Sequence, residues 1–230
     1  MNIQKIRALS FDLDDTLWPI APTLASAEAA LRAWFSKNTP KALPVYENSL
    51  QLASIREDLK LKFKDRLHDL SAMRQALIHE VLSLAGEPTQ GVEEAFEVFF
   101  QARQTVHLYP DVLPALKVLS ARFPIVALSN GNANIQQVGL GDYFTHAISA
   151  QAFGVSKPDP KIFHHTLDCL DLEPEELLHI GDDVHTDVWG ARASLIPCVW
   201  VNREGVAWSG EGEHPVSVRD LSELVELLGS

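Results

Sequence analysis

From residue 107 to the end of the chain, short apolar runs alternate with segments that have the periodicity of a helix. One further run of this kind lies near the amino end, directly before a group of aspartates. Such runs, bounded by turn-forming residues, are typical of strands buried on both faces. Their alternation with helices predicts a parallel sheet covered by helices. We expect strands at Ile6–Phe11, Pro124–Ser129, His146–Ala150, Leu177–Gly181 and Cys198–Val201.

Five helices are expected in the same part of the chain. Asp111 is placed to cap the first of them, which runs to about Arg122. This pattern predicts an α/β fold with a doubly wound, Rossmann-like parallel sheet. The other helices are expected at Ile135–Leu140, Lys161–Leu170, Asp187–Ala193 and Leu221–Leu228, with a glycine-containing loop at Asn202–Pro215.

The stretch between Trp18 and His107 has only helical patterns, so we expect an all-helical domain inserted after the first strand. The predicted division is an α/β core of residues 1–17 and 108–230 and a helical cap of residues 18–107. The insert holds ten basic and eleven acidic residues, whereas the rest of the chain holds nine and 20, so the acidity lies in the core. Helices are expected at Ala21–Lys37, Leu50–Leu61, Leu70–Ala85 and Val92–Val106.

Charge and composition exclude several kinds of partner. The net charge of −12 argues against binding to nucleic acid or to anionic membranes, which both need a positive surface. Two cysteines, Cys169 and Cys198, are too few for the disulfide framework of a secreted protein. The apolar run at the amino end is short and closes on aspartates, which is unlike a signal peptide or membrane anchor. We therefore expect a soluble, cytoplasmic protein.

Polar residues follow three of the expected strands. The carboxyl ends of parallel strands meet at one edge of a sheet, where ligands bind. Several carboxylates at this edge repel one another unless a hard divalent cation such as Mg²⁺ lies among them. With a lysine and a serine added, the site suits an anionic substrate and favours phosphoryl transfer, in which a carboxylate can be the nucleophile. The residues are Asp12 and Asp14 after the first strand, Ser129 and Asn130 after the second, Asp182, Asp183 and Asp187 after the fourth, and Lys157 in a loop.

Each motif alone has a common structural interpretation. An aspartate at a strand end often belongs to a turn. Asp182 and Asp183 can cap the following helix, and Lys157 alone is typical of a protein surface. All four motifs occur in order at strand ends or in connecting loops, however, and this favours one shared site.

These motifs make the chain resemble the haloacid dehalogenase-like (HAD) hydrolases, in the branch with a helical cap inserted after the first motif. The resemblance covers the whole length. It implies a core with a mobile cap, dependence on Mg²⁺ and hydrolysis of a small phosphorylated metabolite through an aspartyl-phosphate. The motifs are Phe11–Leu17, Leu128–Gly131, Ser156–Pro158, and Gly181–Asp183 followed by Thr186 and Asp187.

The same resemblance implies roles for individual residues. Asp12 is similar to the nucleophile, and Asp14 to the general acid that protonates the leaving alcohol and then activates water. The expected metal ligands are the carboxylates of Asp12 and Asp182 and the backbone carbonyl of Asp14. Lys157 is similar to the lysine that neutralises Asp12 and the phosphoryl group.

The remaining core residues of the motifs are expected to bind or support. Ser129 and Asn130 resemble the pair that binds the phosphate. Asp183 and Asp187 are similar to residues that act through metal-bound water or orient the lysine.

Within the family, the motifs bear on three activities, of which simple phosphate ester hydrolysis is the commoner. Dehalogenases lack the second aspartate of the first motif and need no metal, so Asp14 argues against dehalogenation. Phosphomutases keep both aspartates and stay an alternative to a simple phosphatase. The runs Ser129–Ala133, Gly139–Phe144 and Gly181–Val188 resemble bacterial phosphatases that act on flavin mononucleotide and on a phosphorylated ribitylaminouracil of riboflavin synthesis.

The cap is expected to choose the substrate, and two residues are candidates. Arg74 lies on an otherwise apolar helix, and related flavin phosphatases carry an arginine there. Trp18 can stack on a base or a flavin ring, or can equally belong to the core. The cations at 60–66 are more typical of a solvated helix face, and His185 is more typical of a loop residue than of a metal ligand.

A phospho-accepting signalling domain is the alternative from another class, since such receivers also place aspartates, serine and lysine at strand ends. Receivers are about half this length and have no helical insert. A binding protein without turnover is a further alternative, although no motif position is missing here.

Overall fold

The computed structural model describes residues 2–208, 210 and 212–229, and the chain divides into two compact units. The first unit comprises Met1–Pro19 and His107–Ser230, and the second comprises Ile20–Val106. In the first unit six parallel strands form one sheet in the order β3-β2-β1-β4-β5-β6. The strands are β1 (Ala8–Phe11), β2 (Ile125–Ser129), β3 (His146–Ser149), β4 (Leu177–Gly181), β5 (Cys198–Val201) and β6 (Val216–Val218).

The three central strands explain the apolar runs of the sequence. β1 lies between β2 and β4, and every residue of these strands is buried. Ser10 of β1 is in register with Val126 of β2 and His179 of β4, so the three carboxyl ends lie at one edge. A strand covered on both faces has no polar face, and its sequence is therefore a continuous apolar run.

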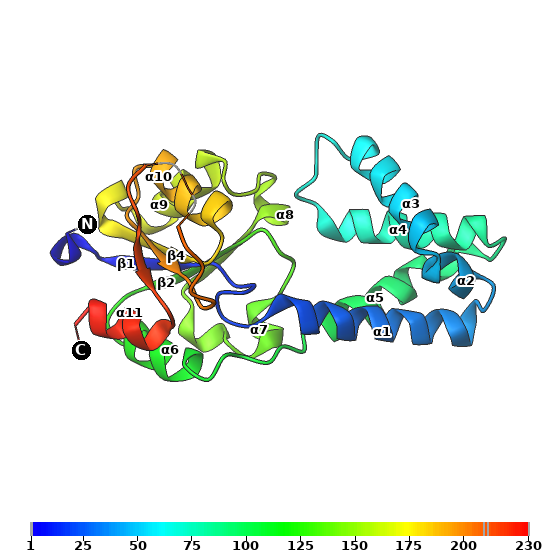
Figure 1. The fold of residues 1–230 in the computed structure, drawn as a ribbon, viewed down its shortest axis with the longest axis horizontal. Coiled ribbons are helices and arrows are strands. Elements are labelled where there is room, and N and C mark those ends of the chain that lie inside the picture. The colour runs from blue at the N-terminus through cyan, green and yellow to red at the C-terminus, as the bar shows by residue number, and fades with distance from the viewer. Residues whose placement is uncertain (1, 209, 211, 230) are drawn as a thin grey trace. The chain divides into compact units, whose positions relative to one another are not determined.

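Helices cover both faces of this sheet (Figure 1). On one face, α9 (Pro160–Leu170) and α10 (Gly190–Ala193) contribute Phe163 and Ala191 to a buried cluster with residues of β1, β2 and β4. On the other face, α6 (Val112–Ser120) packs beside α11 (Leu221–Leu227). The doubly wound α/β fold is confirmed.

Several details of the core differ from the sequence prediction. β6 was not expected, because three residues with a central serine carry no strand pattern. The helical segment after Asp183 begins early, as a π-helical turn at Val184–Trp189 before α10. Asp111 does not cap α6 with its side chain, which instead pairs with Arg203. Two further short helices are α7 (Ile135–Val138) and α8 (Ala150–Phe153), and short 3-10 turns lie at Ile3–Lys5, Gly141–Tyr143 and Pro174–Glu176.

The second unit is built from helices, and none of its described residues belongs to a strand. Its core contains Phe35, Ile78, Leu82 and Phe99, all buried. None of the helices in the described part of the chain is long and apolar enough to cross a membrane. The helices are α1 (Ile20–Asn38), α2 (Ala42–Glu47), α3 (Ser49–Lys62), α4 (Leu70–Leu84) and α5 (Val92–Arg103), with a 3-10 turn at Thr89–Gly91; α2, which contains a proline, was not expected.

Candidate functional site

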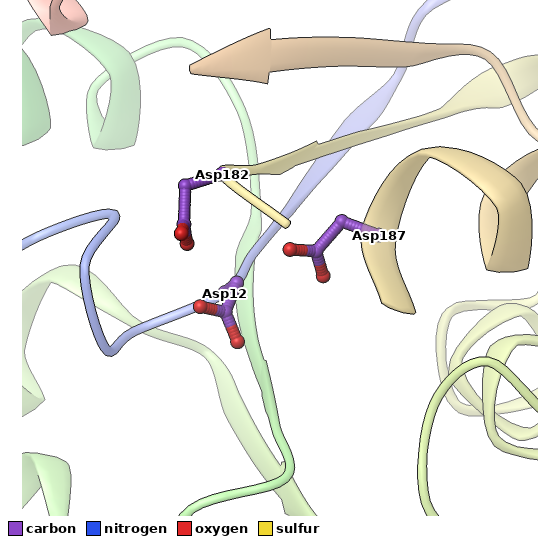
Figure 2. A group of neighbouring side chains, drawn as sticks. All are labelled: Asp12, Asp182 and Asp187. Carbon is purple, nitrogen blue, oxygen red and sulfur yellow. The ribbon is translucent and has the colours of Figure 1, made fainter. Parts of the chain in front are cut away.

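Three carboxylates meet at the carboxyl ends of β1 and β4. The Asp12 amide donates to the Ile180 carbonyl at 2.8 Å, so the ladder continues past β1 and fixes the backbone of Asp12. Asp182 directly follows β4, and Asp187 lies in the helical turn after it. Asp12, Asp182 and Asp187 each place one carboxylate oxygen within 4.8 Å of the others (Figure 2).

Lys157 is the cation of this site. Its ammonium donates to Oδ1 of Asp12 and to Oδ1 of Asp187, both at 2.6 Å, and its side chain is 1% exposed. Asn130 holds the backbone of Lys157 from both sides. The Lys157 amide donates to Asn130 Oδ1 at 2.8 Å, and Asn130 Nδ2 donates to the Lys157 carbonyl at 2.9 Å. Asn130 therefore positions the loop that delivers the lysine.

Asp187 accepts hydrogen bonds at both carboxylate oxygens. Oδ1 contacts Lys157 and also His179 Nε2 at 3.0 Å, and Oδ2 accepts from the Asp183 amide at 3.0 Å. Burial alone raises the pKa of Asp187, but the Lys157 charge and these hydrogen bonds outweigh it and hold the pKa below its ordinary value. Gly181 makes room for this carboxylate, because a Cβ there would lie 2.2 Å from Asp187 Cγ.

The pKa values of the other two carboxylates, Asp12 and Asp182, are shifted upward instead. Burial is the largest effect on Asp12 and raises its pKa well above 3.8. The Lys157 charge lowers this pKa, and the negative charges of Asp187 and Asp182 raise it further. Burial and the nearby Asp187 charge raise the pKa of Asp182 to about 7. Two acids with raised pKa values beside one ionised carboxylate form a site with more acidic groups than the single charge of Lys157 can balance.

A divalent cation fits this donor set. Carboxylate oxygens are the ligands that Mg²⁺ takes in proteins, and Mg²⁺ often uses only one or two of them. Asp187 is already engaged by Lys157, His179 and the Asp183 amide, so Asp12 and Asp182 are the side chains with the better fit. The expected third ligand, the backbone carbonyl of Asp14, lies in the turn after Asp12.

The turn from Asp12 to Trp18 is fixed by hydrogen bonds. Asp15 has φ +59°, and its amide donates to the Trp18 carbonyl at 2.7 Å, which closes the turn. Trp18 Nε1 donates to Oδ1 of Asp14 at 2.9 Å, and Thr16 Oγ1 donates to Oδ1 of Asp182 at 2.9 Å. The turn thereby orients Asp14 and connects the first motif to the fourth.

The remaining predicted residues have local roles in this conformation. Ser129 is buried, and its Oγ accepts from the Gly131 amide at 3.0 Å. Asp183 caps the following turn by accepting from the Thr186 amide at 2.6 Å. Trp18 is fully buried, as a core residue would be.

Arg74 lies in the second unit, where it has two partners. Its guanidinium donates to Oε1 of Glu28 at 2.9 Å and lies 4.0 Å from the centre of the Phe99 ring. Glu28 also accepts from the Tyr46 hydroxyl, so Arg74 belongs to a small polar cluster within the helical unit.

His179, Ser10 and Arg203 were not predicted as functional residues from the sequence. His179 and Ser10 are polar residues inside apolar strands, and they are in register across β1 and β4. A polar residue in a fully buried strand needs a hydrogen-bond partner, and that requirement was the available signal. Arg203 lies in the expected loop after β5 and carries no local pattern.

Comparisons with known proteins agree with this architecture. A family model described as haloacid dehalogenase-like hydrolase matches residues 6–194. The 5-amino-6-(5-phospho-D-ribitylamino)uracil phosphatase YigB of Escherichia coli (strain K12) is 32% identical over 204 residues, which are 87% of this chain and 85% of that protein. Phosphoserine phosphatase of Thermus thermophilus is 31% identical over 66% of this chain and 63% of its own.

A solved structure is similar over almost the full length. The crystal structure of a 2-haloacid dehalogenase from Pseudomonas syringae pv. Tomato DC3000 has a TM-score of 0.92 and 36% identity, covering 97% of this chain and 98% of that one. The named relatives thus include phosphatases and a dehalogenase.

Proposed function

Because this chain belongs to the haloacid dehalogenase-like hydrolases, we propose that it hydrolyses a small phosphomonoester, with Mg²⁺, through an aspartyl-phosphate on Asp12. One observation carries the proposal: the Lys157 ammonium is buried between Asp12 and Asp187, with Asp182 beside them. Preorganised positive charge next to a nucleophilic carboxylate is what phosphoryl transfer requires.

In the first half of the reaction, a carboxylate oxygen of Asp12 attacks phosphorus. The ester P–O bond breaks, and its electron pair goes to the alcohol oxygen, which takes a proton from the Asp14 carboxyl. Trp18 holds Asp14 for this transfer through its indole N–H. Lys157 keeps Asp12 oriented and balances the charge on the phosphoryl oxygens.

In the second half, water attacks the phosphorus of the aspartyl-phosphate. Asp14, now a carboxylate, takes a proton from this water, the bond between phosphorus and the Asp12 oxygen breaks, and inorganic phosphate leaves. Mg²⁺ held by Asp12 and Asp182 would supply the charge neutralisation that lets two anions approach each other.

Dehalogenation is the second candidate, because a 2-haloacid dehalogenase has the similarity reported above. In that reaction Asp12 would attack carbon and release halide. Halide leaves without a proton and the substrate carries no phosphate, so neither a general acid nor a divalent cation is needed. Asp14 and the Asp12–Asp182 pair therefore favour phosphate ester hydrolysis.

For the substrate, we propose a phosphate ester of a ribityl compound, such as flavin mononucleotide or the phosphoribitylamino-uracil of riboflavin synthesis. The support is the 32% identity with the uracil phosphatase, which extends over 87% of this chain. Arg74 stays a candidate for recognising the polar part of such a substrate. Its guanidinium would then release Glu28 and bind the substrate instead. Arg74→Ala should then lower kcat/KM for flavin mononucleotide more than for p-nitrophenyl phosphate.

The test is a screen of purified protein with Mg²⁺ against flavin mononucleotide, nucleotides, sugar phosphates and phosphoserine, measured as phosphate release. Chloropropionate, measured as chloride release, is included in the same plate. Preference for the ribityl phosphates supports the full proposal. Equal rates on all esters would remove the substrate assignment, and release of chloride without release of phosphate would replace the phosphatase by a dehalogenase.

A further inference from the structure

We propose that His179 is a positioning residue, which holds the Lys157 ammonium against Asp12 through a hydrogen bond to Asp187. The geometry of the four residues is independent of the substrate, whereas the catalytic consequence rests on the proposed function. His179 lies in the middle of β4, and its two ring nitrogens contact Ser10 and Asp187.

The four residues belong to a continuous buried chain of polar contacts, which begins at Ser10. Ser10 Oγ lies 2.9 Å from His179 Nδ1, and His179 Nε2 lies 3.0 Å from Asp187 Oδ1. The same Asp187 oxygen accepts from Lys157, which donates also to Asp12. Ser10 and His179 are 0% exposed, so water does not compete for these contacts.

The contacts define which nitrogen of His179 carries hydrogen. The carboxylate of Asp187 only accepts, so His179 Nε2 must be the donor. Nδ1 of the neutral ring then accepts from the Ser10 hydroxyl. Burial, opposed by Asp187, holds the pKa of His179 below its ordinary value and agrees with the neutral form. The Phe163 ring meets the imidazole edge-on, with centroids 5.1 Å apart, and fixes its plane.

These contacts hold both carboxylate oxygens of Asp187. The Asp183 amide holds Oδ2, and His179 shares Oδ1 with Lys157. Without the His179 N–H, Oδ1 has one donor fewer, and the carboxylate turns toward Lys157 and draws the ammonium away from Asp12. The pairing matters most after Asp12 has become an aspartyl-phosphate, because Asp187 is then the carboxylate that still pairs with Lys157.

Two polar substitutions separate the proposed role from simple packing. The amide of His179→Gln reaches the position of Nε2 and can donate to Asp187, whereas the shorter His179→Asn reaches Ser10 only. With p-nitrophenyl phosphate and Mg²⁺, we expect His179→Gln to keep kcat within about threefold of the unmodified protein. His179→Asn should lower kcat about tenfold or more. KM should fall with kcat, because slower hydrolysis lets the aspartyl-phosphate accumulate.

Thr166→Val is the control for the loss of a buried hydrogen bond. Thr166 is 0% exposed, and its hydroxyl donates to the Ile162 carbonyl within α9. The Thr166→Val protein should be less stable than the unmodified protein and should have the same kcat. If His179→Asn does not fold, His179→Leu, which also lacks the N–H, replaces it. Equal kcat values for the Gln and the Asn or Leu variants, or a matching loss in Thr166→Val, would overturn the proposal.

A second measurement does not depend on phosphatase activity. Equilibrium unfolding in urea is compared for His179→Asn, Lys157→Met and the double variant. Because Asp187 links the two residues, the change in the unfolding constant of the double variant should differ from the product of the two single changes by about fivefold or more. Effects that multiply within about twofold would contradict the link. If the unmodified protein hydrolyses no phosphate ester, the proposed function fails, and this coupling still decides the role of His179.

Discussion

The guanidinium of Arg203 donates one hydrogen bond to each carboxylate oxygen of Asp111, from Nη1 to Oδ1 at 3.0 Å and from Nη2 to Oδ2 at 2.9 Å. The same guanidinium donates to the Thr16 carbonyl at 2.9 Å and lies 3.9 Å from the centre of the Tyr109 ring. Asp111 also accepts from the Leu221 amide at 2.9 Å. One ion pair therefore connects the turn of the first motif, the start of α6 and the start of α11.

Replacing Arg203 should destabilise the first unit. We expect Arg203→Met to lower the free energy of unfolding by about 2–3 kcal/mol, because a mostly buried carboxylate loses its charged partner. Arg203→Lys should recover only part of the lost free energy of unfolding, since one ammonium cannot pair with both carboxylate oxygens as a guanidinium does. Urea denaturation measures both. The control is Arg219→Met, which removes an exposed i,i+4 pair with Glu223 and should change little; an equal loss in both would contradict the assignment.

The same pair predicts a pH dependence of stability. Burial raises the pKa of Asp111, but hydrogen bonds from Arg203 and the Leu221 amide outweigh it and lower the pKa below 3.8. The ionised group therefore stabilises the folded state fully above its ordinary pKa, and this contribution is lost as the pH falls through the lowered value. The stability difference between the unmodified protein and Asp111→Asn should be constant near pH ~6 and shrink below pH ~4. A difference that stays constant to pH ~3 would contradict the pairing.

How much of the fold could be predicted depended on burial. β1, β2 and β4 are covered on both faces, so their sequences are apolar runs that a pattern detects. β6 has two exposed residues of three, and α8 has four residues, which is too short for a period. These elements depend on their neighbours rather than on their own sequence.

The candidate site divides in a similar way. Strand ends mark Asp12 and Asp182, because parallel strands share a carboxyl edge. Lys157 reaches them from a loop, and what fixes it is its backbone pairing with Asn130, which no local pattern encodes. His179 was hidden inside an apolar run, and its role is visible only once β1 and β4 are placed side by side.

Asp12→Asn should abolish phosphate release, by at least about 10³-fold in kcat, because an amide is a poor nucleophile. The protein should remain folded, as measured by circular dichroism. Beryllium fluoride, which mimics the acyl-phosphate, should bind the unmodified protein and not the variant. Asp220→Asn makes the same charge change at the cap of α11, where asparagine caps equally well, and should keep full activity. Normal turnover by folded Asp12→Asn would remove Asp12 from the role of nucleophile.

Mg²⁺ should raise the melting temperature, because an ion that binds only the folded state stabilises it by mass action, by about 2.7 kcal/mol at one hundred times its Kd. EDTA should reverse the shift and stop turnover. Asp182→Asn should lose most of the Mg²⁺ response, whereas Asp220→Asn should keep it. If neither EDTA nor Mg²⁺ changes the melting temperature or the activity, no divalent cation binds among these carboxylates.

Asp14→Asn should separate the two halves of the reaction. A general acid matters most when the leaving group is poor. Formation of the aspartyl-phosphate should therefore slow strongly with an alkyl phosphate and little with p-nitrophenyl phosphate, whose nitrophenolate leaves without a proton. Water attack on the intermediate should slow with both substrates, because Asp14 is also the base.

Stopped-flow absorbance with p-nitrophenyl phosphate measures this directly. We expect a burst of about one nitrophenolate per active site, followed by a steady state slowed about 10²–10⁴-fold, the usual contribution of general acid–base catalysis. Asp220→Asn is again the control and should show the trace of the unmodified protein. Equal losses on alkyl and aryl phosphates without a burst would mean that Asp14 acts mainly through the geometry of its turn. If Asp14→Asn retains all activity and chloride is released from chloropropionate, the site belongs to a dehalogenase, for which a proton donor at this position has no task.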